Sequence, residues 1–202
     1  YTGGTHVAAG GLLVTGSITG DTVVDTGALI GGSGTTGGLT IHSGGYLSPG
    51  SSPDQLFVDE YLVLESGANY IVEVVTGNQP GDGVIGYDQV VVAGTVSLDG
   101  ANLLLVTTPL TDIRVGQQLT IIDNDASDPV VGLFASLAEG AEVLVEGLPY
   151  FTISYVGGVD GNDVILTALV NTIPEPTAVL LLALGVLPLA RRGRRGCRAP
   201  RA

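Results

Sequence analysis

The fold of this chain is decided by residues 27–74, which read GALIGGSGTTGGLTIHSGGYLSPGSSPDQLFVDEYLVLESGANYIVEV. Short runs of alternating apolar and polar residues follow one another here, separated by glycine, asparagine, aspartate or proline. Alternation with a period of two indicates strands that bury one face, and the separating residues are typical of turns. The pattern continues on both sides, and no segment before residue 177 keeps an apolar period of 3.6 residues, so we expect an all-β body.

A degenerate unit recurs within this body. It consists of an apolar-x-apolar run, one or two spacers, a glycine, a small residue, one more residue and an apolar position. Its glycine and small residue are Gly27–Ala28, Gly44–Gly45, Gly67–Ala68 and Gly100–Ala101, with the glycines 17, 23 and 33 residues apart. Glycine allows the positive φ of a sharp bend between short strands, and a small neighbour lets coils stack closely. We therefore expect a β-solenoid with coils of uneven length and insertions along one edge.

The residues after the repeats follow a different pattern. From residue 112 to residue 169 the strands are longer, and an acidic loop, IDNDASDPVVGLF, interrupts them. The open end of a stack of coils exposes strand edges and apolar interior, so it needs a cap. We expect solenoid coils over residues 1–106 and a β-rich cap over residues 107–170. The aromatic residues that we expect to pack this cap are Tyr150, Phe151 and Tyr155.

One segment of the body resembles a known family. SGGYLSPGSSPDQL, residues 43–56, is similar to the end of the β-helix repeats in autotransporter passengers and related bacterial surface proteins. Those families carry Gly-x-Leu-x-Pro-Gly-x-Ser-Pro-Gly at this point, and Asp54 replaces the last glycine here. The resemblance covers residues 10–105 and implies a right-handed parallel β-helix.

The charge of the chain is divided between body and tail. Residues 1–173 hold 19 of the 20 acidic residues and one basic residue, Arg114, for a charge of −18. Residues 174–202 hold Glu175 and six arginines, for a charge of +5, and the two sum to −13. An acidic body repels phosphate backbones, so we expect no nucleic-acid partner. The single cysteine, Cys197, lies in the tail and cannot form an internal disulfide.

The tail follows a proline-rich linker, residues 171–177, which ends the folded part because proline disfavours both helix and sheet. An apolar run, residues 178–190, and an arginine-rich end, residues 191–202, come next. As a helix, residues 177–190 would span roughly 21 Å at about 1.5 Å per residue, which is short of a hydrocarbon core of about 30 Å. Basic residues favour a cytoplasmic location, so we expect a short hydrophobic transmembrane helix with a cytoplasmic end.

The order of these tail segments resembles the PEP-CTERM sorting signal of exported bacterial proteins. A Pro-Glu-Pro motif, Pro174, Glu175 and Pro176, precedes the apolar run. The basic residues that flank the run on its other side are Arg191, Arg192, Arg194 and Arg195. The resemblance implies export, an inner-membrane intermediate and an exosortase-type sorting protease that recognises the motif. Because the chain begins at Tyr1 and contains no Met, we expect a fragment or processed form that lacks an N-terminal export signal.

The body offers few residues for catalysis. A polysaccharide lyase on a β-helix needs an arginine or lysine base, and Arg114 is the only such residue in residues 1–173. A hydrolase with paired carboxylates remains an alternative because acids are plentiful. His6 and His42 are too few and too isolated for a metal cluster, so we interpret both as surface residues of strands or turns. We expect no enzyme and no cofactor.

Calcium is the small ligand that the sequence leaves open. GGVDGNDVIL, residues 157–166, resembles the calcium-binding nonapeptide of repeats-in-toxin proteins, with Asp160 inserted before Gly161 and a single copy. Asp160 and Asp163 are the candidate ligands, and the alternative interpretation is a simple turn before the last strand. The loop acids Asp123, Asp125 and Asp128 have the same two interpretations. We expect an exported structural or adhesive protein of the cell surface or extracellular matrix, in contact with extracellular polysaccharide, with a Ca²⁺-dependent adhesion module as a further alternative.

Overall fold

The computed structural model of the chain describes residues 3–50, 53–75, 86–107, 113–125, 128–145 and 148–169. Over these residues the protein contains strands and turns and no helix, which confirms the all-β prediction. The strands are short and rich in β-branched and aliphatic residues, as in TVV and YLVL, which suit a pleated surface with one buried face. The expected hydrophobic C-terminal helix lies outside the described residues.

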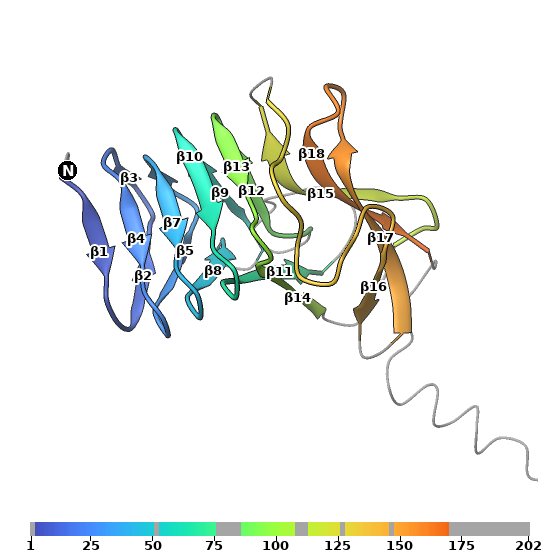
Figure 1. Cartoon of the computed structure of the whole chain (residues 1–202), viewed down its shortest axis with the longest axis horizontal. Helices are drawn as coiled ribbons and strands as arrows, with labels where there is room; N and C mark the ends of the chain where they lie inside the picture. Colours follow the sequence, from blue (N-terminus) through green and yellow to red (C-terminus); the bar gives the residue numbers. More distant parts are fainter. Residues whose placement is uncertain are drawn as a thin grey trace, which may run out of the picture.

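The strands form three sheets, and each sheet follows one side of an elongated stack (Figure 1). The first sheet contains, in spatial order, β1 (Thr5–Val7), β4 (Thr22–Val24), β7 (Leu39–Ile41), β10 (Tyr61–Leu64) and β13 (Thr95–Ser97). The second sheet contains β2 (Gly11–Leu13), β5 (Leu29–Gly32), β8 (Tyr46–Pro49), β11 (Asn69–Val74) and β14 (Asn102–Thr107).

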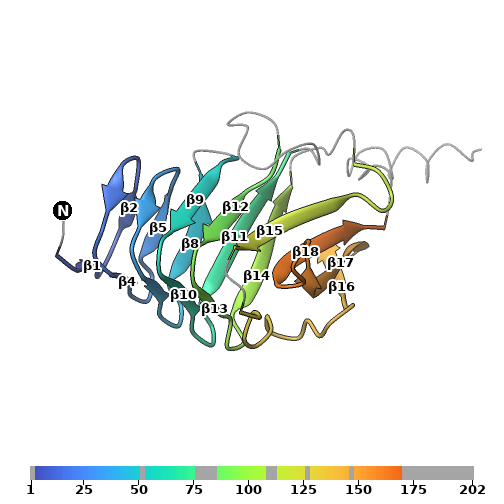
Figure 2. The same ribbon diagram turned by 90° about the horizontal axis from the view of Figure 1, so that it is seen from above.

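The third sheet has a parallel part and an antiparallel part. Its parallel strands are β3 (Ser17–Ile18), β6 (Thr35–Thr36), β9 (Gln55–Val58), β12 (Gln89–Val92) and β15 (Gln118–Asn124). Its antiparallel strands, beyond β15, are β18 (Asp163–Ala168), β17 (Leu148–Gly157) and β16 (Glu142–Val145). The chain therefore visits the three sheets in turn and adds one parallel strand to each sheet on every pass (Figure 2).

Parallel pairing in register places equivalent residues of successive coils above one another. Val24 pairs with Ile41, and Ile41 pairs with Leu64, so an inward apolar row forms along the first sheet. All three side chains have no exposed surface. Burial of such a side chain stabilises the fold by about 1.5–3 kcal/mol, so each row contributes in proportion to the number of stacked coils.

The recurring glycines form a row at the corner between the first and second sheets. Gly27, Gly44, Gly67 and Gly100 have φ values of 77°, 76°, 80° and 79°, in the left-handed region that glycine occupies without strain. Each backbone N–H in turn donates to the carbonyl of the next glycine, at 2.9, 2.8 and 3.4 Å. The prediction that the recurring unit marks the bend between stacked strands is confirmed.

The extra residues of the longer coils fall at a different corner, between the second and third sheets. Successive connections there comprise residues 14–16, 33–34, 50–54 and 75–88. The other two corners keep short connections, such as residues 42–45 and 59–60. Most of the added length lies in these connections, as expected from insertion along one edge, and longer strands such as β9 and β11 supply the rest.

The end unit, residues 113–169, lies at the far end of the stack from β1 (Figure 1). The segment between β15 and β16 pairs with β13, because Val131 N donates to Val96 O and Leu98 N donates to Val131 O, both at 2.9 Å. Inside, Phe134 stacks on Tyr70 of β11 with ring centroids 6.1 Å apart, and Tyr155 lies 6.3 Å beyond. The core of the stack thus continues into the end unit through an aromatic spine, Tyr70–Phe134–Tyr155.

Candidate functional site

Polar residues line the outside of the glycine corner in a row. Asp25, His42 and Glu65 each follow the last residue of a first-sheet strand, two positions before a row glycine. Because β4, β7 and β10 pair in register, these three residues lie at equivalent positions of successive coils. Neighbouring strands are about 4.8 Å apart, which brings the side chains within contact distance.

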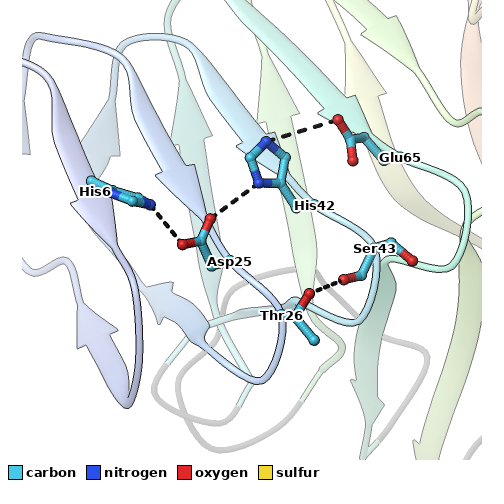
Figure 3. Close-up of polar contacts among 6 residues, drawn as sticks. All are labelled: His6, Asp25, Thr26, His42, Ser43 and Glu65. Atoms are coloured by element: carbon cyan, nitrogen blue, oxygen red, sulfur yellow. Dashed lines mark hydrogen bonds and ion pairs between the residues drawn. The ribbon is translucent and has the colours of Figure 1, made fainter.

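The contacts in this row join two histidines to two carboxylates (Figure 3). His6 Nε2, from β1, lies 2.7 Å from Asp25 Oδ2, and His42 Nδ1 lies 3.1 Å from Asp25 Oδ1. His42 Nε2 lies 3.8 Å from Glu65 Oε1. The hydrogen bond with His6, aided by His42, holds the pKa of Asp25 below its ordinary value. We name these four residues the imidazole–carboxylate row.

The backbone under the row is rigidly held. Thr26 Oγ1 donates to Ser43 O of the next coil at 2.6 Å, and both residues appear in Figure 3. The turn closes on itself because Ala28 N donates to Asp25 O at 3.0 Å and Gly45 N donates to His42 O at 2.9 Å. The positions of Asp25 and His42 are therefore set by the coil, while their side chains remain partly accessible to solvent.

His6 lies on β1 and His42 directly follows β7, with side chains 61% and 42% exposed, which agrees with the interpretation of both as surface residues of strands or turns. They are not isolated, however, because the structure places both against Asp25. The signal was available in the sequence. Asp25 and His42 are 17 residues apart, the same spacing as Gly27 and Gly44, so the recurring unit already places them in one row. As the side chains lie, no three His, Cys, Asp or Glu residues within the described ranges are grouped so that they could hold a metal ion.

A buried carboxyl group lies at the corner where the insertions occur. Asp88 is 2% exposed; its Oδ1 accepts from Asp54 N at 3.0 Å and its Oδ2 accepts from Glu73 N at 2.9 Å. Burial raises the pKa of Asp88 to about 7, in spite of the two N–H donors. A carboxyl group with that pKa suits acid–base chemistry, but both oxygens of Asp88 are occupied by backbone. Its evident role is to tie the starts and ends of β9, β11 and β12 together.

The calcium candidates lie in two loops that the structure brings together. Asp163 Oδ1 accepts from Asn124 N at 3.0 Å, and Asn124 Nδ2 donates to Asp128 O at 2.8 Å. Burial raises the pKa of Asp163, and the charges of Asp123 and Asp160 raise it further. Asn124 Oδ1 is buried without a hydrogen-bond partner. The carboxylate of Asp163 thus serves to hold β15 beside β18, and the loop acids increase the negative charge around it.

The aromatic residues of the end unit lie in its core, as expected. Tyr150, Phe151 and Tyr155 are 5%, 0% and 5% exposed. Tyr155 Oη accepts from Phe134 N at 3.1 Å and donates to Leu137 O at 2.8 Å. Because all three rings are buried, none of them has an exposed face on which a sugar could stack.

The sorting residues fall in a part of the chain that the structure does not describe. Pro174, Glu175 and Pro176 lie there, as do the linker, the apolar run 178–190 and the four flanking arginines, Arg191, Arg192, Arg194 and Arg195. Within the described ranges there is no helix with the length and apolar character needed to cross a membrane. No protein-family model and no curated protein matches this sequence.

Proposed function

We propose that this chain is an exported, non-enzymatic structural or adhesive protein of a bacterial surface or extracellular matrix. Its body is a right-handed parallel β-helix, its end unit is the cap, and its C-terminal tail is a sorting signal. The observation that carries the proposal is the order of segments after residue 170: a Pro-Glu-Pro motif, an apolar run and clustered arginines, behind a body built from repeats.

The architecture supports the structural role. The parallel strands of the three sheets pair in register and form long, regular outer faces, which suit extended contact with a matrix. The acidic body, with a charge of −18 over residues 1–173, stays soluble among other proteins and attracts cations. Extracellular polysaccharide is the partner that we infer for these faces.

The tail supports the route. In this proposal the apolar run, residues 178–190, pauses in the inner membrane, and Arg191 and Arg192 stay on the cytoplasmic side. An exosortase-type protease recognises Pro174, Glu175 and Pro176 and removes the segment behind them. The acidic body is then released outward. The recognition residues bind a partner and take no part in chemistry of this chain.

The test is the mass of the mature protein in a host that expresses the sorting protease. Protein extracted from the cell surface is expected to lack the sequence beyond about the Pro-Glu-Pro motif, and a Pro174→Ala/Pro176→Ala variant is expected to remain in the inner-membrane fraction. Pro200→Ala, at the far end of the tail, is the matched control and should be processed normally. Recovery of the Arg194–Ala202 peptide from surface protein would overturn the sorting proposal.

A further inference from the structure

We propose that β14, the last strand of the second sheet, binds the same strand of a second copy of this chain, edge to edge and antiparallel. The pairing joins the second sheets of the two copies into one sheet across a two-fold axis. The inference is independent of the sorting route, because it rests on the described edge of this strand alone.

The second sheet ends at β14, whereas the other two sheets continue into the end unit (Figure 1). The first sheet gains a parallel bridge between Ser97 and Val131, and the third sheet continues from β15 into β18, β17 and β16. The end unit reaches only the corner before β14, where Ala135 N donates to Ala101 O at 2.8 Å. Within the described ranges no strand lies beside β14 on the side away from β11, so β14 is an edge strand.

The outer edge of β14 presents backbone groups for pairing. Asn102 N donates to Ala68 O at 2.8 Å, so residue 102 and every second residue after it bond the preceding coil. The N–H and C=O groups of Leu103, Leu105 and Thr107 point the other way. Among the described residues, none bonds the backbone of these three on that side. An additional strand would complete these hydrogen bonds.

The interior face of β14 is also incompletely covered. Tyr70 and Val72 of β11 have no exposed surface. Leu103 and Leu105 pair with them and pack against the same core, but both remain only half-buried. The difference arises because each inner strand has a neighbour on both sides and β14 has one. An additional strand would therefore bury apolar surface as well as pair the backbone.

The charge of the molecule favours contact at this edge. The body carries −18 over residues 1–173, so two copies repel each other at most relative orientations. The strand, NLLLVT, has no charged residue and no proline, which are the side chains that commonly protect an exposed edge. Glu73 of β11 pairs with Val106, so this acid lies one strand further from the partner. Two acidic bodies can approach closely along an uncharged strand.

The order of side chains in β14 is complementary to itself, which indicates a second copy as the occupant. With the two-fold axis beside Leu105, antiparallel pairing places Leu104 opposite the partner's Val106, and Leu103 opposite the partner's Thr107. Leu104 and Val106 are 41% and 48% exposed on the outer face, and in this register each covers the other's equivalent. On the inner face the two Leu105 side chains meet over the open end of the core. The pairing occupies the edges of both copies, so assembly stops at a dimer.

Sedimentation velocity of the full chain over a concentration series tests the dimer. A Cys197→Ser background excludes a disulfide between copies, and a nonionic detergent covers the apolar run 178–190. The strand is only 6 residues long, so the interface is smaller than the standard one of about 800 Å² per partner. We expect a monomer at about 1 µM and mostly dimer at about 500 µM, as for a weak interface.

Two double variants test the antiparallel register. Leu104→Glu/Val106→Glu places like charges opposite one another and should weaken association at least about 10-fold. Leu104→Glu/Val106→Lys places each new glutamate opposite a new lysine of the partner, so association should be restored. Both positions are exposed, and the circular dichroism of both variants should match that of the parent. Equal association of the two double variants would overturn the proposal.

The matched control is Leu13→Glu, at a 59% exposed position of β2, the strand at the opposite end of the same sheet. It should leave the association unchanged. Loss of association in this variant would overturn the proposal, because the copies would then join end to end through β14 and β2.

Hydrogen exchange of single amides separates strand pairing from contact between side chains. The N–H groups of Leu103 and Leu105 should exchange slowly only at the high concentration. The N–H of Leu104 should be protected at both concentrations, because it already bonds β11. A chain that stays monomeric at about 500 µM would overturn the proposal, whether its edge is bare or occupied by residues 178–190.

Discussion

Different contacts stabilise the two regions of the molecule, which are the coils over residues 3–107 and the end unit over residues 113–169. In the coils each strand pairs in parallel with its equivalent in a neighbouring coil, and turns that repeat in sequence set the register. In the end unit, β16, β17 and β18 pair antiparallel, and the register shifts at irregular points such as Ser154/Gly157. Repetition suffices to propagate the parallel stack, whereas the end unit is held by contacts that do not repeat.

The two regions meet at the aromatic spine, and we expect the largest change in the free energy of unfolding when its central ring is removed. Phe134 is 2% exposed and lies between Tyr70 of the coils and Tyr155 of the end unit. Phe134→Ala should lower the free energy of unfolding in urea by about 3–5 kcal/mol, since it leaves a cavity at the junction. The matched control is Phe57→Ala on β9, where a 39% exposed ring faces outward and the change should be within about 0.5 kcal/mol. Similar effects of the two substitutions would contradict the continuous core.

Acid titration sharpens the comparison at the insertion corner. Asp88 has a native pKa of about 7, above its unfolded value, so between those values the folded state holds a proton that the unfolded state releases. The contribution of Asp88 to the free energy of unfolding should therefore be largest below about pH 4. It should fall by at most about 4 kcal/mol as the pH rises to about 7. Urea midpoints measured across this range check the slope.

The control for this titration is Asp88→Asn, which removes the ionisable group and should flatten the slope. Asp123 and Asp163 of the end unit, whose pKa values are also raised by burial, should leave a smaller slope of the same sign. Asp25 acts in the opposite direction, because its lowered pKa adds stability that is lost only in strong acid. An unchanged slope in the Asp88→Asn variant would assign the effect to the end unit.

The smallest change in stability is expected for two glycine-to-alanine substitutions, one where coils pack closely and one in a turn with open space around it. A methyl group at Gly94 would collide with the carbonyl oxygen of Glu60 in the preceding coil, whereas a methyl group at Gly140 in the end unit meets nothing within 4 Å. Gly94→Ala should cost about 3 kcal/mol through overpacking. Gly140→Ala should cost about 1 kcal/mol, because its φ of 74° is strained for alanine. Thermal melts of both variants give the difference, and equal costs would show that coil spacing tolerates a methyl group.

The same contrast explains what the sequence could predict. The stack follows from local rules: the positions of Gly27, Gly44 and Gly67 give the bends, and the alternation between them gives the inward faces. The placement of Asp25, His42 and Glu65 in one row could be deduced from that spacing once the unit is extended two residues upstream, whereas His6, 19 residues before Asp25, falls outside the spacing.

The end unit could not be derived in the same way. Tyr70 and Phe134 are far apart in sequence and share no repeat, so nothing local predicts that their rings stack. The hydrogen bond from Asn124 N to the Asp163 carboxylate likewise depends on antiparallel pairing of β15 with β18, which alternation alone does not specify. The sorting residues Pro174, Glu175 and Pro176 remain a prediction from sequence order.

The confinement of long connections to one corner makes this body a platform for loop grafting. Residues 33–34 and residues 50–54 join equivalent strands, yet the glycine row on the opposite corner keeps its register. A connection of new length at residues 33–34 should therefore leave the three sheets in place, since loop closure costs rise only slowly with length. Successive connections along this edge are displaced by about 4.8 Å, the distance between paired strands. Binding peptides inserted in several coils would thus be displayed in a line at known intervals, a regular multivalent array on a single chain.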